Sequence, residues 1–348
     1  MSEMRYVEKI CRDLCCTVGV SGYENMSSSE AAANALRAFT DDVQVDFMGN
    51  VIGYLNRERT DLPLLLLDAH IDEIGMIVTY IEDDGFVRVS NCGGIDRRLL
   101  SAQEVTIYGK KPVFGVFGSK PPHIATEAER NKIPELSEMY IDIGMSKEEA
   151  EKLIAPGDRV ITNSNFHKLL NDRISVKSLD DRCGVACILE ALRLLKEEHA
   201  ELPCRLAVLF SSQEETNYGG CTSAAYRINP DIAIAVDVSF ALTSDAPKDR
   251  CGFMGKGAMI GIAPALNKSL SDKLTAIAKE KEIPYQPEVM GAHTGTNADV
   301  LSNMRGGVVT GVVSIPLRYM HTPIEEIQLS DLEAVGRLLA EYAKQASL

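Results

Sequence analysis

Two adjacent carboxylates, Glu214 and Glu215, come shortly after an apolar run, LAVLF at 206–210, that is typical of a buried strand. Like charges at a strand end repel one another and resist removal from water, so the pair is either solvated or neutralised by a nearby cation. Solvation is the ordinary explanation for a Glu-Glu pair. The polar residues at the ends of other predicted strands favour neutralisation of the pair by a cation.

Other residues of metal-ligand type lie at the ends of predicted strands or in the loops after them. His70 and Asp72 close the segment LPLLLLDAHID, and Asp237 closes IAIAVD, while Asp180 and His321 lie in loops. Open α/β sheets place their active sites at the carboxyl ends of the strands. Several imidazoles and carboxylates in such positions predict a metal site, which needs neutral imidazoles and ionised carboxylates.

Two divalent ions close together need a bridging carboxylate, terminal ligands and a position for water. Asp180 is the best bridge, because it opens a turn between the segment ISVKSL and a predicted helix. The terminal ligands are then His70, Glu215, Asp237 and His321. Glu214 stays beside the ions without binding them and is free to act as general base on an activated water. Asp72 is a natural acceptor for an imidazole N–H of His70 that would fix its tautomer, with a turn cap as the alternative.

The elements that must position these residues form an alternating α/β pattern. Helices are expected at 27–39, where serines form the N-terminal cap, and near 182–198, 268–281 and 330–345. Strands are expected at 43–47, 51–55, 62–72, 204–212 and 231–237. Residues 74–169 instead hold short β-like runs between glycine, proline and aspartate clusters, with one helical stretch at SKEEAEKL. We therefore expect a catalytic α/β domain over 1–73 and 170–348, interrupted by a β-rich domain at 74–169.

Composition narrows the possible partners and location. The chain has 348 residues and a formal net charge of −14, with no basic block, so nucleic acid and anionic membrane surfaces are excluded as expected partners. No apolar segment reaches spanning length, and the first residues are charged, which predicts a cytoplasmic protein. The nine cysteines are scattered without a repeated C-x-x-C spacing, as is typical of reduced, buried thiols.

Short motifs follow one another in a characteristic order along nearly the whole chain. They are GVSGYE, DFMGNVIG, DAHIDEIGMIV, SLDDRCGVACILEAL, SSQEET, AVDVS, IPYQPEV, GTNAD and PLRYMHTPIEEI. In this ordered set the chain resembles the dinuclear aminopeptidases of metallopeptidase family forty-two, which include glutamyl aminopeptidases and the tetrahedral (TET) aminopeptidases.

The resemblance implies a central mixed sheet flanked by helices, as in zinc exopeptidases, interrupted by a small β-barrel or PDZ-like dimerisation domain. It implies two ions, zinc or cobalt, with His70 and Asp237 on one, Glu215 and His321 on the other, and Asp180 between them. Glu214 would be the base. It also implies a homodimer, or a dodecamer built from dimers, that acts on short peptides with a free N-terminus.

Three loops depart from the family pattern. Asn297 stands where the family has aspartate, although Asp299 follows two residues on; the segment from Ser239 lacks a Gly-Asp-rich loop; and NYGGC, which contains Tyr218, replaces a Gly-x-Arg-Gly-Ala sequence. We expect these loops to affect substrate preference more than metal chemistry. His293 is either a substrate-binding residue or an ordinary loop histidine.

Two other functions stay open at this point. One is a related dinuclear amidohydrolase or deacylase that acts on a non-peptide amide. The other is a non-catalytic assembly protein that retains the fold, against which the complete ligand set and Glu214 argue. A glycosidase is disfavoured, because its acid and nucleophile must not be occupied by metal.

Overall fold

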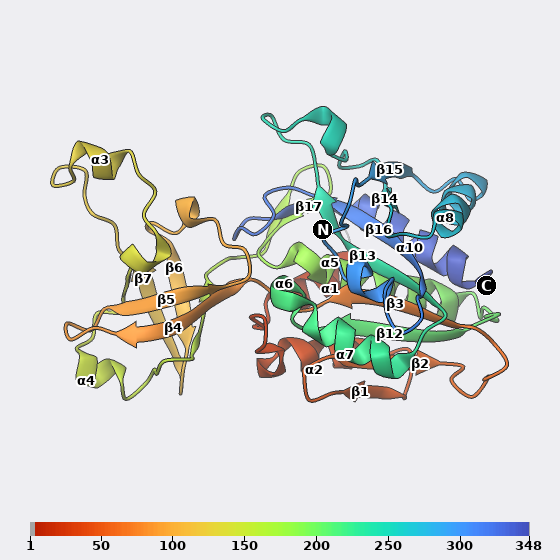
Figure 1. The fold of residues 1–348 in the computed structure, drawn as a ribbon, viewed down its shortest axis with the longest axis horizontal. Coiled ribbons are helices and arrows are strands. Elements are labelled where there is room, and N and C mark those ends of the chain that lie inside the picture. The colour runs from red at the N-terminus through yellow and green to blue at the C-terminus, as the bar shows by residue number, and fades with distance from the viewer. Residues whose placement is uncertain (1–3, 348) are drawn as a thin grey trace.

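The computed structural model describes residues 4–347, and an eight-stranded mixed sheet forms the centre of its larger lobe (Figure 1). In order across the sheet the strands are β1 (Val43–Val45), β2 (Val51–Leu55), β12 (Arg205–Ser211), β3 (Leu64–His70), β13 (Ile232–Phe240), β16 (Val309–Leu317), β14 (Ala258–Ile262) and β15 (Tyr285–Val289). The four central strands β12, β3, β13 and β16 are parallel. Their carboxyl ends therefore meet at one edge of the sheet.

Helices cover both faces of this sheet. One face packs against α1 (Tyr6–Cys15), α2 (Ser28–Leu36), α5 (Leu179–Glu197), α8 (Lys268–Glu280) and α10 (Leu329–Ala343). The other face packs against α7 (Gly219–Ile228) and α9 (Ala298–Leu301). Among the described residues, no helix is long and apolar enough to cross a membrane.

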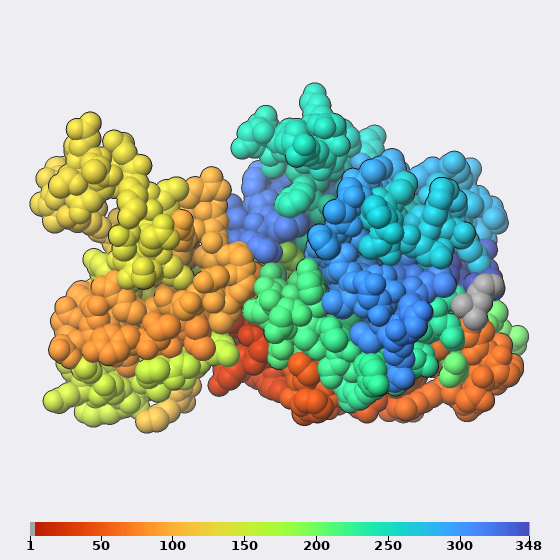
Figure 2. Space-filling view, in the orientation of Figure 1, coloured from red at the N-terminus to blue at the C-terminus, as the bar shows by residue number. Residues whose placement is uncertain are grey.

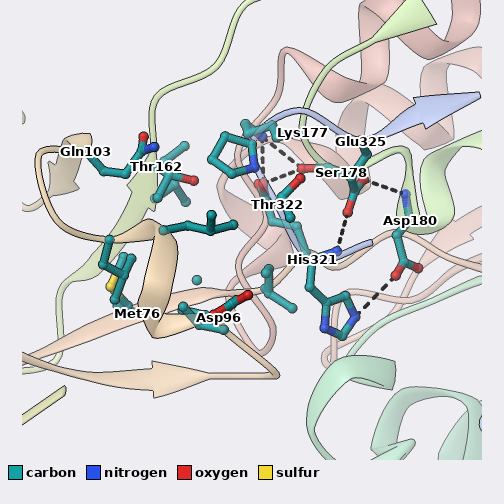
Figure 3. A pocket seen from close by; sticks show the side chains of 18 of the residues that line it. Met76, Asp96, Gln103, Thr162, Lys177, Ser178, Asp180, His321, Thr322 and Glu325 are labelled. Carbon is teal, nitrogen blue, oxygen red and sulfur yellow. Dashed lines mark hydrogen bonds and ion pairs between the residues drawn. The ribbon is translucent and has the colours of Figure 1, made fainter. Parts of the chain in front are cut away.

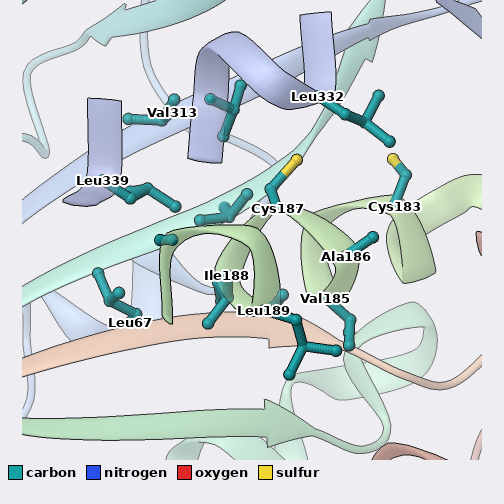
Figure 4. Packing of buried hydrophobic residues seen from close by; sticks show 14 of the residues in the cluster. Leu67, Cys183, Val185, Ala186, Cys187, Ile188, Leu189, Val313, Leu332 and Leu339 are labelled. Atoms are coloured by element: carbon teal, nitrogen blue, oxygen red, sulfur yellow. The ribbon is translucent and has the colours of Figure 1, made fainter. Parts of the chain in front are cut away.

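The apolar run of β3 explains why this strand is central. Leu65 and Leu67 belong to the core on the α5 face, while Leu64 and Leu66 belong to the core on the α7 face. Successive side chains of a strand point to opposite faces, so an uninterrupted run of leucines fits a strand buried on both sides. Figure 4 shows α5 above the sheet, with Cys187 and Ile188 among the apolar side chains between α5, β3 and α10.

A closed six-stranded barrel forms the second lobe, seen to the left in Figures 1 and 2. Around the barrel the strands are β4 (Gly75–Ile81), β5 (Val87–Cys92), β8 (Ile141–Asp142), β7 (Pro112–Phe117), β6 (Glu104–Tyr108) and β9 (Arg159–Thr162). The barrel has its own apolar core and carries two short helices, α3 (Glu127–Arg130) and α4 (Lys147–Ala150). The mixed sheet, its flanking helices and the inserted barrel confirm the predicted fold class. The boundaries at 74 and 169 and the role in dimerisation stay predictions.

Two smaller elements lie outside the large sheet and the barrel. β10 (His167–Leu169), β11 (Arg173–Ser175) and β17 (Glu326–Gln328) form a three-stranded sheet, and α6 (Glu214–Asn217) follows β12 directly. The helix expected at 27–39 is shorter, and Ser27 makes no side-chain cap. Its hydroxyl instead accepts the N–H of Val18 at 2.8 Å and donates to the carbonyl of Val18 at 3.0 Å, so it fastens the preceding loop.

Candidate metal centre

The five residues predicted as metal ligands come from four different elements and one loop, and they meet at the carboxyl edge of the sheet. His70 is the last residue of β3, Asp237 lies in β13, Asp180 is at the start of α5, and Glu215 is in the first turn of α6. His321 lies in the loop between β16 and β17. The structure therefore brings together all five residues.

Distances between these side chains divide them into two groups that share one member. His70 Nε2 lies 3.1 Å from Asp180 Oδ1 and 3.9 Å from Asp237 Oδ1. On the other side, His321 Nε2 lies 3.3 Å from Asp180 Oδ2 and 3.3 Å from Glu215 Oε2. In each group the three donor atoms lie within 4.8 Å of one another. Asp180 thus offers one carboxylate oxygen to each group, which is the arrangement of a bridging ligand.

The pKa shifts of Asp237 and His321 indicate that this cluster suits bound cations. Burial raises the pKa of Asp237 well above its ordinary range, and Asp180 adds to the shift. Burial opposes the charge on His321, yet Asp180 and Glu215 raise its pKa to about 11. Carboxylates packed at this density need neutralisation, and oxygen with imidazole nitrogen is a donor set that suits zinc or cobalt.

Glu214 lies beside these groups but belongs to neither. Its Oε2 is 3.8 Å from His70 Nε2, and its side chain is about 10% exposed. Burial raises the pKa of Glu214 to about 9, with further contributions from Asp237 and Glu215. A carboxylate in this position can exchange a proton with a bound water.

Asp72 contacts both the imidazole and the glutamate pair. Its Oδ1 lies 3.4 Å from His70 Nδ1, the nitrogen that faces away from Asp180. The same carboxylate accepts the backbone N–H of Glu214 at 3.0 Å and of Glu215 at 3.1 Å. The backbone carbonyl of Asp72 also lies near His70 Nδ1, at 3.3 Å, so the acceptor role predicted for the carboxylate stays a prediction. The sequence analysis missed the two amides.

Glu325 is a further buried carboxylate that the sequence did not single out. It accepts the backbone N–H of Asp180 at 3.1 Å and of His321 at 2.9 Å. It is 2% exposed, and burial raises its pKa well above the ordinary value. The feature of the sequence that could have identified Glu325 is its position, four residues after His321 in the segment PIEEI.

A buried ion network lies behind Asp180. Glu73 pairs with Lys177 at 2.6 Å and with Arg182 at 3.2 Å, and it accepts the hydroxyl of Ser178. Burial alone would raise the pKa of Glu73, but Lys177 and Arg182 lower it to about 2. This network fixes the chain immediately before Asp180.

The departing loops lie around the site. Asn297 is buried, and its amide donates to Asp68 Oδ2 at 2.7 Å and to Ser211 Oγ at 2.8 Å. Asp299 accepts the backbone N–H groups of Thr294 and Gly295. The side chain of His293 is 89% exposed and lies 3.8 Å from Asp299. Two residues of the departing loops, Tyr218 and Gly295, line the cleft described next.

Two pockets open onto the same three predicted ligands, Asp180, Glu215 and His321. The first, the open cleft, has a volume of about 290 Å³ and is also lined by Glu214, Thr216, Tyr218, Asp237, Val238, Gly295 and Met320. The second, the junction pocket, is narrower, at about 40 Å³, and lies between the lobes (Figure 3). Barrel residues such as Met76, Asp96 and Gln103 line one of its sides, and Lys177, Ser178 and Glu325 line the other.

Comparison with known proteins agrees with this arrangement. The family described as M42 glutamyl aminopeptidase matches residues 49–338. The chain is 35% identical over 328 residues to a lysyl aminopeptidase of Pyrococcus furiosus, covering 92% of each protein. It superposes on a TET aminopeptidase from a marine sediment thaumarchaeote with a TM-score of 0.93 and 31% identity, covering 98% of this chain and 97% of that one.

A third comparison concerns assembly. The TET1 peptidase of Pyrococcus horikoshii, described as able to assemble into a tetrahedron or a large octahedral shell, matches with a TM-score of 0.85 and 31% identity, covering 98% of this chain and 100% of that one. The family match and these similarities extend over both lobes. The chain belongs to the M42 glutamyl aminopeptidase family of hydrolases.

Proposed function

We propose that this protein removes N-terminal residues from short peptides in a reaction that depends on two divalent metal ions. Two donor groups that share Asp180 carry the proposal, together with a glutamate, Glu214, that belongs to neither group. Family membership supports aminopeptidase activity. The ions would be zinc or cobalt, in keeping with a nitrogen and oxygen donor set.

Each ligand has a defined part in this proposal. His70 and Asp237 would hold one ion, Glu215 and His321 the other, and Asp180 both. When bound, such ions lower the pKa of water and polarise a scissile carbonyl. The contacts of Asp72 and Glu325 would keep the ligands in place, because each carboxylate holds two backbone amides of the site.

Glu214 would move the proton. Hydrolysis breaks the C–N bond of the first peptide group, adds hydroxyl to the carbonyl carbon and leaves a proton for the departing nitrogen. Glu214 would accept that proton from water and deliver it to the amine, and its raised pKa in the metal-free protein is compatible with carrying it. Nearby cations would bring the pKa down into the working range of a general base.

Assembly and location belong to the same proposal. The P. horikoshii relative supports a homo-oligomer, with the domain at 74–169 as the dimerisation unit. Short peptides with a free N-terminus would be the partners, because an aminopeptidase removes the residue that carries the free amino group. We expect a cytoplasmic location.

Peptide cleavage followed by mass spectrometry tests the proposal. Protein loaded with zinc or cobalt is incubated with short peptides, each with a free and with an acetylated N-terminus. Stepwise loss of residues from the free peptides alone is the expected result. Removal of the acetyl or another acyl group alone would instead identify an amidohydrolase, and no reaction at full metal occupancy would favour a non-catalytic assembly protein.

A further inference from the structure

Tyr218 lines the open cleft beside Glu214 and is half-buried there. It occupies the variable position of the family sequence Gly-x-Arg-Gly-Ala, where this chain has NYGGC, so the resemblance assigns it no role. Across residues 4–347, its hydroxyl has no hydrogen-bond partner in the protein. A half-buried hydroxyl that opens onto a cleft is free to bond a ligand there.

The backbone holds Tyr218 in a fixed place between two helices. It lies between α6 and α7, with a φ of 59° and a ψ of 20°, a left-handed conformation that is uncommon for a bulky residue. Its carbonyl accepts the N–H of Thr222 at 2.9 Å, and the N–H of Gly219 donates to the side chain of Asn217 at 2.8 Å. Such conformations persist where the surrounding contacts determine them, and they are frequent in active sites.

The lining of the cleft is rich in acceptors and poor in donors. Its carboxylates are those of Asp180, Glu214, Glu215 and Asp237. Ionised carboxylates accept hydrogen bonds and donate none. Of the two side-chain hydroxyl groups in the lining, that of Thr216 lies 2.9 Å from Ser21 Oγ, so the phenol of Tyr218 is the one available to a substrate.

The phenol also keeps its proton at neutral pH. Burial raises the pKa of Tyr218 above its ordinary value of 10, and four carboxylates raise it further, those of Glu214, Asp299, Asp237 and Glu215. The hydroxyl is therefore a donor throughout the pH range in which a peptidase would work.

Peptide hydrolysis creates an acceptor for such a donor. When the oxygen of water bonds to the carbonyl carbon, one electron pair of the C=O bond moves to the carbonyl oxygen, which becomes negatively charged. When the C–N bond breaks, that pair restores the C=O bond, and the leaving nitrogen takes the proton that Glu214 carries. A donor aimed at this oxygen stabilises the charged state more than the neutral peptide, so it raises kcat.

We infer that Tyr218 is a further catalytic residue, whose hydroxyl donates a hydrogen bond to the oxygen of the scissile carbonyl as that oxygen becomes negatively charged. This inference rests on the proposed function and adds a residue to the same site. The carboxylates of the lining would repel a negative oxygen, so a neutral donor among them has a particular effect on the transition state.

Kinetics of Tyr218→Phe on two substrates test the inference. The substrates are X-Ala-Ala and the p-nitroanilide of X, where X is the residue that the wild-type protein removes fastest from mixed peptides; the anilide has a single carbonyl group. In zinc-loaded protein, kcat should fall by about 10- to 100-fold on both substrates, while KM changes by less than about threefold. Zinc content and the temperature of thermal unfolding should equal those of the wild type. Tyr226→Phe removes the hydroxyl of a 57% exposed tyrosine of α7 and, as the matched control, should leave kcat unchanged.

Tyr218→Leu separates the hydroxyl from the ring, and it should lose about as much kcat as Tyr218→Phe. Full kcat in Tyr218→Phe with loss in Tyr218→Leu would assign the effect to the ring and overturn the inference.

Three further results also overturn it. A raised KM at unchanged kcat would mean that the hydroxyl binds the neutral peptide, and an effect confined to X-Ala-Ala would mean that it binds the departing part. Loss of zinc or of thermal stability in Tyr218→Phe would show a structural role. All of these results leave the aminopeptidase proposal standing, whereas failure of the zinc-loaded wild-type protein to cleave any peptide overturns both.

Discussion

The carboxylate of Asp72 holds Glu214 through its backbone N–H at 3.0 Å and, with its second oxygen, holds Glu215 in the same way at 3.1 Å. These bonds fix the first turn of α6. As a result the two neighbouring glutamates present their side chains to different partners, Glu215 to His321 and Glu214 toward His70. The two glutamates of this like-charged pair therefore face different imidazoles.

Asp72→Asn should lower peptide turnover by about 10- to 100-fold. An amide has one acceptor oxygen, so its NH₂ group would face a backbone N–H and release one glutamate. Steady-state kinetics on a Leu-Ala-Ala peptide, with thermal unfolding as a check on folding, measure the effect. Unchanged kcat with a correctly folded variant would contradict the role given to this carboxylate.

Glu214→Gln should reduce kcat by about 10²- to 10⁴-fold and still bind two ions per chain. Glutamine keeps the shape of the side chain but cannot accept the proton of a water molecule. Turnover and metal content by mass spectrometry are measured on the same sample. Full turnover at normal metal content would show that the base lies elsewhere.

Glu325→Ala should weaken metal binding by about 10- to 100-fold, because the amides of Asp180 and His321 lose their shared acceptor. Titration of chelator-stripped protein with zinc measures the affinity. Glu326→Ala is the control, since Glu326 pairs with Arg173 at 3.0 Å and touches neither amide. Equal losses in the two variants would mean that the segment matters and the carboxylate does not.

Glu73→Gln should lower the free energy of unfolding by about 3–5 kcal/mol, because Arg182, 1% exposed, would be left buried without its charge partner. Glu333→Gln breaks a half-exposed pair with Arg5 and should cost less than about 1 kcal/mol. Urea unfolding compares the two.

The lowered pKa of Glu73 also predicts that the free energy of unfolding depends on pH. The pKa of Glu73 is lowered to about 2 from 4.5 in the folded chain, so its stabilising effect is complete above pH 4.5 and is lost as the pH falls toward 2. The difference in stability between wild type and Glu73→Gln should shrink over that interval. A constant difference would assign the effect to packing.

Metal uptake should release protons. His321 has a pKa of about 11 in the metal-free protein and is therefore protonated at pH 7, whereas a ligating imidazole must be neutral. The apparent affinity should rise about tenfold per pH unit for each proton displaced. Calorimetry of zinc binding between pH 6 and 8, in buffers of different ionisation enthalpy, counts the protons. An affinity independent of pH would contradict the prediction.

Patterns in the sequence were sufficient for the two strands that carry predicted ligands, but not for α6, which carries Glu215, or for the start of α5 at Leu179, which places Asp180 in a helix and not in a loop. The apolar runs that end at His70 and Asp237 predicted buried strands with polar carboxyl ends, and β3 and β13 are such strands. The position of β3 between β12 and β13 was not predictable, because pairing between distant strands leaves no local period. β14, β15 and β16 were missed. β14 and β15 are short, and β15 contains Pro287, which disfavours a strand assignment except at an edge. β16 is a nine-residue strand whose apolar run could have been recognised.

In the site, the contacts that could not be predicted from the sequence are those between side chains and backbone amides. Side chains that bind metal are recognisable by type, but Asp72 and Glu325 act on the amides of other residues, and such contacts exist only once the chain is folded. A buried glutamate bound to backbone N–H groups has the same appearance in a sequence as a solvated one.

The insertion of the barrel after β3 also sets an order of events during synthesis. All strand pairs of the barrel form within residues 75–162, so this lobe can fold as soon as it has emerged from the ribosome. β3 must wait, because both of its neighbours, β12 and β13, are made more than a hundred residues later. Its leucines stay exposed in the meantime, and pairing across such separations is slow. The candidate metal centre can be completed only later still, because the last of its predicted ligands, His321, follows all four central strands of the sheet.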